Sequence, residues 1–217
     1  MASRTDFGIL SGNRASSLAV QSTDLIAGSE DGTGLCNARV AQRQSIELIP
    51  RRFLVRIQAR AQMRELKKLV GYIVKQGLLA LRTHAPGSEF RLDYLAIFCR
   101  DGEEYEDLVG VVESLGKEVR AGSVKTGKTF LLREALPTDG GFLRLIKIRK
   151  PDASRPQRGA PDFKVENYVE FKEKYLRSSG DFTLMIRKDY EMIELKGIDV
   201  LVYIPDRTLG DRLGLHA

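Results

Sequence analysis

The sequence has few of the side chains that most enzyme sites use. It contains only two histidines, His84 and His216, and two isolated cysteines, Cys36 and Cys99. The scarcity of both argues against a zinc site, a disulfide framework and a Ser-His-Asp relay. The apolar runs are far too short to cross a bilayer, and no stretch resembles a signal peptide. We therefore expect a cytoplasmic protein with no membrane partner.

Lysine is missing from the first part of the chain. Residues 1–62 contain eight arginines and no lysine, whereas thirteen lysines lie between Lys67 and Lys196. The first 45 residues are rich in Ser, Gly, Asp and Asn without a sustained hydrophobic period, which is typical of disorder. We expect residues 1–62 to be a disordered or non-native extension, and translation from Met63 is the alternative.

What the chain does have is a substantial apolar content, 42%, and a net charge of +6. The apolar content is enough for a real core, and the positive charge is compatible with an anionic partner. Arginine recurs every four residues at Arg52, Arg56, Arg60 and Arg64, which would stripe one face of a helix. That stripe makes nucleic acid a possible partner, although a solvated face is the favoured interpretation.

The remainder reads as a helix followed by two copies of one plan. Residues 63–90 predict a helix and a linker, with Leu66, Val70, Ile73 and Leu81 on one side. In residues 91–150, the strand "RLDYLAIFC" precedes a helix that Asp101 and Glu104 cap and Gly116 ends. Two strands flank "PTDGG", a hairpin turn signal, and a further short strand is predicted within residues 117–124.

Residues 151–217 repeat this order after a linker. The strand "APDFKVE" leads to a helix capped by Asn167 and Glu170, and three strands follow: "FTLMIRK", "YEMIEL" and "IDVLVYIPD". The sequence therefore predicts an α+β fold with two tandem βαβββ units in curved mixed sheets. An N-terminal helix and a disordered tail precede them.

Two short motifs suggest other chemistries. "GSVKTGKT" (residues 122–129) has the spacing of a P-loop, but the following segment is too β-like for the helix that a P-loop requires. Asp181, Glu194 and Lys196 resemble the Asp and Glu-x-Lys core of the PD-(D/E)xK nucleases, which hold Mg²⁺. A strand follows Lys196 where that family has a helix, so we keep a Mg-dependent nuclease or phosphodiesterase as an alternative.

Paired βαβββ units are the hallmark of the vicinal oxygen chelate superfamily, the glyoxalase and bleomycin-resistance proteins. Residues 91–206 resemble it, in particular its YecM-like branch, through the strand openings "LDYLAIF" and "PDFKVE". In that superfamily a His or Gln on the first strand of a unit and a Glu on the last hold a metal. Tyr94 and Phe163 stand where the histidines would fall. The resemblance thus implies the fold with a site that has lost its metal and needs no cofactor.

The ligand of such a site is predicted from charge. The linker between the units contributes Arg149, Arg155 and Arg158, and the strand before it Arg144 and Lys147. Arginines held at a cleft can fork onto a carboxylate or phosphate. With Asp93, Tyr94 and Asp162 at the strand openings, these residues predict a cleft for a small anionic molecule. The sequence does not decide between an enzyme and a binding protein, or between a monomer and a homodimer.

Overall fold

The structure is a computed structural model that describes residues 51–120, 125–178, 180–197 and 199–215, with backbone alone for residues 51–55 and 178. The predictions for residues 1–50, including Cys36 and the disordered tail, lie outside the described residues. The described chain falls within one compact unit, residues 50–217.

A long helix, α2 (Arg51–His84), opens this unit. It begins ahead of the predicted start at Met63, so residues 51–62 belong to the same helix. The reason is local, because this stretch is rich in Arg, Ala and Gln and contains no proline or glycine. The predicted apolar side is confirmed, with Leu66, Ile73 and Leu81 fully buried. Among the described residues, no helix combines the length and apolarity needed to span a membrane.

The first βαβββ unit follows the predicted order. It consists of β1 (Arg91–Phe98), α3 (Gly102–Leu115), β2 (Gly116–Glu118), β3 (Gly127–Thr138) and β4 (Gly141–Arg149). The Asp101 carboxylate accepts the Glu104 backbone N–H at 2.8 Å and caps α3 as predicted. Lys128 and Thr129 lie in a strand, so the helix that a P-loop needs after its lysine is replaced by β3.

The second unit repeats the plan with β5 (Gly159–Lys164), α4 (Tyr168–Ser178), β6 (Phe182–Ile186), β7 (Glu191–Lys196) and β8 (Leu201–Pro205). Asn167 accepts the Glu170 backbone N–H at 3.1 Å and begins α4 as predicted. A short helix that the sequence analysis did not predict, α5 (Leu209–Arg212), follows β8. Its capping box, formed by Thr208 and Asp211, was the available signal.

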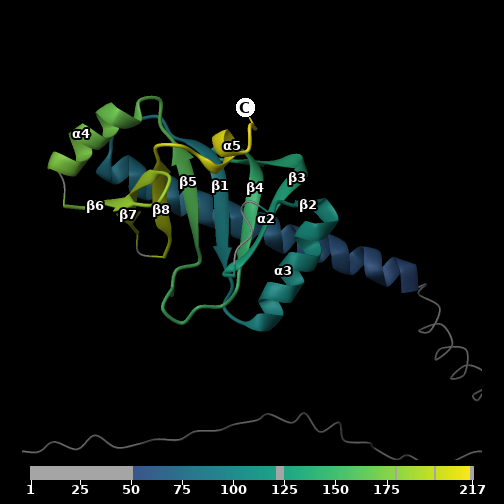
Figure 1. Cartoon of the computed structure of the whole chain (residues 1–217). Helices are drawn as coiled ribbons and strands as arrows, with labels where there is room; N and C mark the ends of the chain where they lie inside the picture. Colours follow the sequence, from purple (N-terminus) through teal and green to yellow (C-terminus); the bar gives the residue numbers. More distant parts are fainter. Residues whose placement is uncertain (1–50, 121–124, 179, 198, 216–217) are drawn as a thin grey trace, which may run out of the picture. The chain divides into compact units, whose positions relative to one another are not determined.

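The two units join into one eight-stranded mixed sheet with the order β2-β3-β4-β1-β5-β8-β7-β6 (Figure 1). In each unit the first strand lies parallel to the last, β1 beside β4 and β5 beside β8. The antiparallel pairing of β1 with β5 connects the units. The prediction of an α+β fold with two tandem βαβββ units is confirmed, and the two sheets merge into one.

The faces of this sheet differ. The long helix α2 crosses behind the sheet in Figure 1, and residues of α2, α3 and α4 share one core with Leu95, Ile97 and Phe163 of the central strands. Because side chains alternate along a strand, Ala96, Phe98 and Ala160 face the other way and form a smaller apolar cluster with Leu201. We call this side, away from α2, the open face.

Candidate functional site

The open face carries a pocket of about 550 Å³, a volume within the usual range for a small-molecule site. Ala96 and Ala160 lie at its floor on the two central strands, where larger side chains would fill the hollow. We call this cavity the open-face pocket. The remaining lining residues are Tyr94, Phe98, Thr126, Lys147, Arg149, Arg155, Asp162, Arg187, Tyr190, Met192, Tyr203, Leu209 and Arg212.

Strand register brings distant residues together there. Tyr94 on β1 pairs with Asp162 on β5, and Asp162 pairs with Tyr203 on β8. Ala96, two residues after Tyr94 on β1, pairs with both Lys147 on β4 and Ala160 on β5. Two rows of side chains from the two units therefore run side by side across the middle of the sheet.

The charge of the pocket is strongly positive. Five cations line it: Lys147, Arg149, Arg155, Arg187 and Arg212. They come from β4, the linker after it, the β6–β7 turn and α5. Asp162 is the single carboxyl in the lining that the structure describes. A cleft lined by charges of one sign focuses the field and attracts ligands of the opposite sign.

The environment of Asp162 favours its neutral form. Burial raises the pKa of Asp162 well above its ordinary value, and the Asp93 carboxylate raises it further, while Arg212 acts in the opposite direction. Burial also lowers the pKa of Lys147, with a second contribution from the neighbouring Arg149 guanidinium. A bound anion would offset the repulsion between those two cations.

Rings and hydroxyl groups complete the lining. Burial raises the pKa of Tyr94, whose hydroxyl is hydrogen-bonded with Thr129, and burial likewise raises the pKa of Tyr203. The guanidinium carbon of Arg149 lies 4.5 Å from the centroid of the Phe98 ring, and that of Arg212 lies 4.5 Å from the Tyr190 ring. Stacking of this kind holds an arginine in place while leaving its N–H groups free to fork onto an oxyanion.

Five predicted ligand-binding residues line the open-face pocket, namely Tyr94, Lys147, Arg149, Arg155 and Asp162. Asp93 lies beside it and accepts the Gly210 backbone N–H at 3.0 Å, so it anchors α5, the helix that carries Arg212. Arg144 is exposed on β4 and is not among the lining residues.

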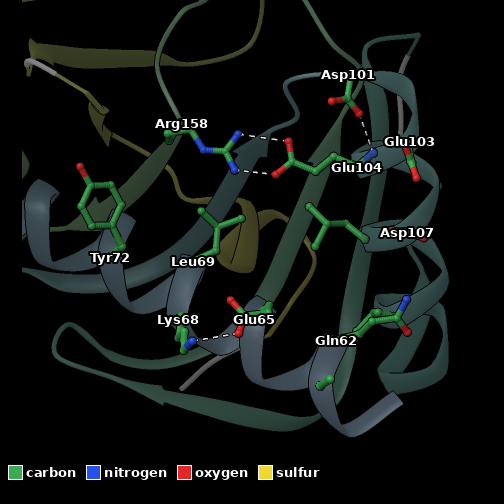
Figure 2. A pocket seen from close by; sticks show the side chains of 13 residues that line it. Gln62, Glu65, Lys68, Leu69, Tyr72, Asp101, Glu103, Glu104, Asp107 and Arg158 are labelled. Atoms are coloured by element: carbon green, nitrogen blue, oxygen red, sulfur yellow. Dashed lines mark hydrogen bonds and ion pairs between the residues drawn. The ribbon is translucent and has the colours of Figure 1, made fainter. Parts of the chain in front are cut away.

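Arg158 occupies a different place from the predicted one. Its Nη2 lies 2.6 Å from Glu104 Oε1, and its Nη1 donates to the Phe98 carbonyl at 2.9 Å. Figure 2 shows this guanidinium directed at the Glu104 carboxylate. The side chain therefore fastens the start of β5 to the first turn of α3 instead of facing the anion pocket.

The Glu104–Arg158 pair borders a second cavity, of about 720 Å³, which we call the α2–α3 cavity (Figure 2). Leu69, Leu108 and Val111 contribute apolar surface to it. The charges are mostly negative: Glu65, Asp101, Glu103, Glu104 and Asp107, against Lys68 and Arg158. This cavity is thus opposite in charge to the open-face pocket.

Asp181, Glu194 and Lys196, the residues of the predicted nuclease site, have different surroundings in the structure. Asp181 lies 2.9 Å from His84 Nδ1 at the end of α2, and Glu194 is buried in β7 opposite Tyr203. Lys196 is exposed at the end of β7. Within the described parts of the chain, no three His, Cys, Asp or Glu side chains form a group that could hold a metal ion.

Among the pocket residues that sequence reasoning missed are Arg187, Tyr190, Tyr203 and Arg212. Tyr203 lies in a predicted strand whose facing direction was unknown, and Arg187 and Tyr190 flank a hairpin turn. Arg212 belongs to the unpredicted α5. The local signals were the alternation of side chains along β8, which contains Tyr203, and the capping box that begins α5, which contains Arg212.

Comparison with known proteins supports the fold and gives no information about function. Neither a protein-family model nor a curated protein matches the chain. A solved structure described as "Structural Genomics, Protein EC4020" is similar, with a TM-score of 0.51 and 11% sequence identity. The likeness covers 70% of this chain and 93% of that one. At this identity it supports the arrangement of strands and helices and carries nothing about activity.

Proposed function

We propose that this protein binds a small anionic molecule in the open-face pocket, where its two βαβββ units meet. The observation that carries the proposal is the convergence of five cations from four separate segments on one hollow. Its single carboxyl, Asp162, has a raised pKa and so opposes an anion weakly. Phenol hydroxyl groups and forked guanidiniums are suitable donors for carboxylate or phosphate oxygens.

We further propose that the pair of units belongs to the vicinal oxygen chelate type and that binding needs no metal. The residues present do not fit the family's metal. Tyr94 replaces one expected histidine, while Phe163 faces the helical core, so the pocket-facing residue beside it is Asp162. Five surrounding cations would repel a divalent ion.

The proposal is tested by thermal unfolding and calorimetric titration of the full chain with inorganic phosphate, pyrophosphate and glutarate. A ligand that binds only the folded state raises the melting temperature. We expect at least one of these probes to raise it, and the exchange Lys147→Gln to remove most of the rise. Arg56→Gln is the matched control, because Arg56 is an exposed cation on α2 outside the pocket.

The alternatives give different results in the same assay. A melting temperature that rises with Mg²⁺ or Mn²⁺ after chelator treatment, and no longer does so in Glu194→Gln, would support the nuclease prediction. Salt-sensitive DNA binding that is lost in an Arg56, Arg60 and Arg64 triple glutamine variant would support a nucleic-acid partner. No response to any anion would overturn the proposed function.

A further inference from the structure

The five cations of the open-face pocket form two groups at opposite ends of β1. Lys147, Arg149 and Arg155 belong to the end of β4 and the linker after it, and Arg149 pairs in register with Phe98 at the end of β1. We call them the linker group. Figure 1 shows this linker at the end of β1 and α5 near its start.

The second group, Arg187 and Arg212, lies toward the start of β1, and we call it the α5 group. Gly210 of α5 donates its N–H to Asp93, the residue before Tyr94. Arg212 lies against the Tyr190 ring, and the Arg187 N–H donates to the Tyr190 carbonyl at 2.9 Å. Tyr190 thus links both members of the group. Four residues of extended strand separate Tyr94 from Phe98, which is roughly 13 Å.

The surface between the groups is mainly apolar, although Lys147 borders it in register with Ala96. Ala96 and Ala160 form its floor, and the Tyr94 and Tyr203 phenols border it. Burial raises the pKa of Tyr203, whereas Arg155 from the linker group and Arg187 from the α5 group both act to lower it. The Tyr203 phenol therefore lies within electrostatic reach of a cation from each group.

We infer that the ligand is a dianion with an anionic group at each end and an uncharged middle on the order of 10 Å long, from the strand spacing above. This inference rests on the proposed function. A single small anion bound at one group would make no contact with the other. A ligand that reaches both gains because the second contact is intramolecular once the first has formed.

The experiment compares methylphosphonate with alkane-α,ω-bisphosphonates of increasing chain length, titrated calorimetrically into the full chain. We expect affinity to rise to an optimum length at which the bisphosphonate binds about a hundredfold more tightly than methylphosphonate. Arg155→Gln and Arg187→Gln each remove one exposed cation, one from each group, and should leave folding intact. Each should weaken the optimal bisphosphonate about tenfold, as expected for the loss of a charge-assisted contact.

The two single variants separate the inference from the function on which it rests. If methylphosphonate binds, but no chain length improves on it and only one of the two exchanges matters, the two-ended ligand is wrong and simple anion binding stands. If neither probe binds, the proposed function itself fails. Arg56→Gln should bind every probe like the unaltered chain, and the melting temperature of each free variant verifies its folding.

Discussion

The open-face pocket and the α2–α3 cavity differ in how their charges are used. In the α2–α3 cavity both cations of the lining are paired within the wall: Arg158 with Glu104 at 2.6 Å, and Lys68 with Glu65 at 2.8 Å. In the open-face pocket, Arg149 and Arg212 lie against aromatic rings, and the Asp152 carboxylate is 3.7 Å from Arg149. The α2–α3 cavity is the larger of these two, and its Glu104–Arg158 pair joins α3 to the start of β5.

The difference also follows from position in the fold. The α2–α3 cavity is a gap between two helices that already share a core with the sheet. Of the helices in the described residues, α5 alone lies on the open face, as a single turn that anchors to Asp93. A sheet face with alanines at its centre and cations around it leaves polar groups for a ligand to satisfy.

The largest expected effect comes from filling each cavity in turn. Ala96→Leu places an isobutyl group on the floor of the open-face pocket, and we expect phosphate affinity to fall on the order of a hundredfold through steric exclusion. Ala61→Leu is the matched exchange, because Ala61 lines the α2–α3 cavity. It should leave affinity unchanged. Calorimetric titration measures both, and equal losses would contradict the separation of roles.

The next effect contrasts two arginines three positions apart in one linker. Arg158→Met leaves the half-buried Glu104 carboxylate without its partner, and we expect it to lower the free energy of unfolding by about 2 kcal/mol with little change in anion affinity. Arg155→Met should do the reverse, since Arg155 is exposed and lines the pocket. Urea unfolding measures the stability of both variants, and phosphate titration measures their anion affinity. A loss of stability in Arg155→Met would contradict the expected difference between the two arginines.

A pH dependence follows from Asp162. Its pKa is raised in the folded state by burial and Asp93, so between the unfolded and folded pKa values the folded state holds the extra proton. Stability contributed by this group is therefore full below the unfolded pKa and is lost as pH rises through the folded pKa. The slope reaches at most about 1.4 kcal/mol per pH unit. Asp162→Asn should flatten the curve of unfolding free energy against pH, whereas parallel curves would contradict it.

The same proton affects the ligand. Above the folded pKa, the ionised Asp162 carboxylate would repel an anion, so we expect phosphate affinity to fall with rising pH in the unaltered chain and to fall less in Asp162→Asn.

Much of the fold was predictable because its signals are local. Asp101 with Glu104 and Asn167 with Glu170 mark the two helix starts, and both caps form as the spacing requires. Strand alternation and the turn at Asp139 located the hairpins. The start of α2 at Arg51, ahead of the predicted start at Met63, was missed because the first turns of the helix lack apolar periodicity.

The site was predictable only in part because it depends on facing direction and on contacts between distant residues. Arg155 and Arg158 look alike in the sequence, and only the fold assigns one to a pocket and the other to Glu104. The pairing of β1 with β5 is irregular between Leu92 and Tyr94, so Tyr94 lies opposite Asp162 and not Pro161. A shift of one residue turns the side chain to the other face of the sheet. No local pattern reveals that shift.

The smallest effect is expected from the acidic rim of the α2–α3 cavity. Asp107 is exposed on α3 and borders that cavity (Figure 2). Asp107→Asn should change the unfolding free energy by no more than about 0.5 kcal/mol, as for most surface exchanges. Phosphate affinity should stay within about twofold, because charges separated by more than a Debye length are screened at physiological salt. A clear gain in affinity would mean that the two cavities are electrostatically coupled through the sheet, and the comparison between them would need one shared field instead of two independent sites.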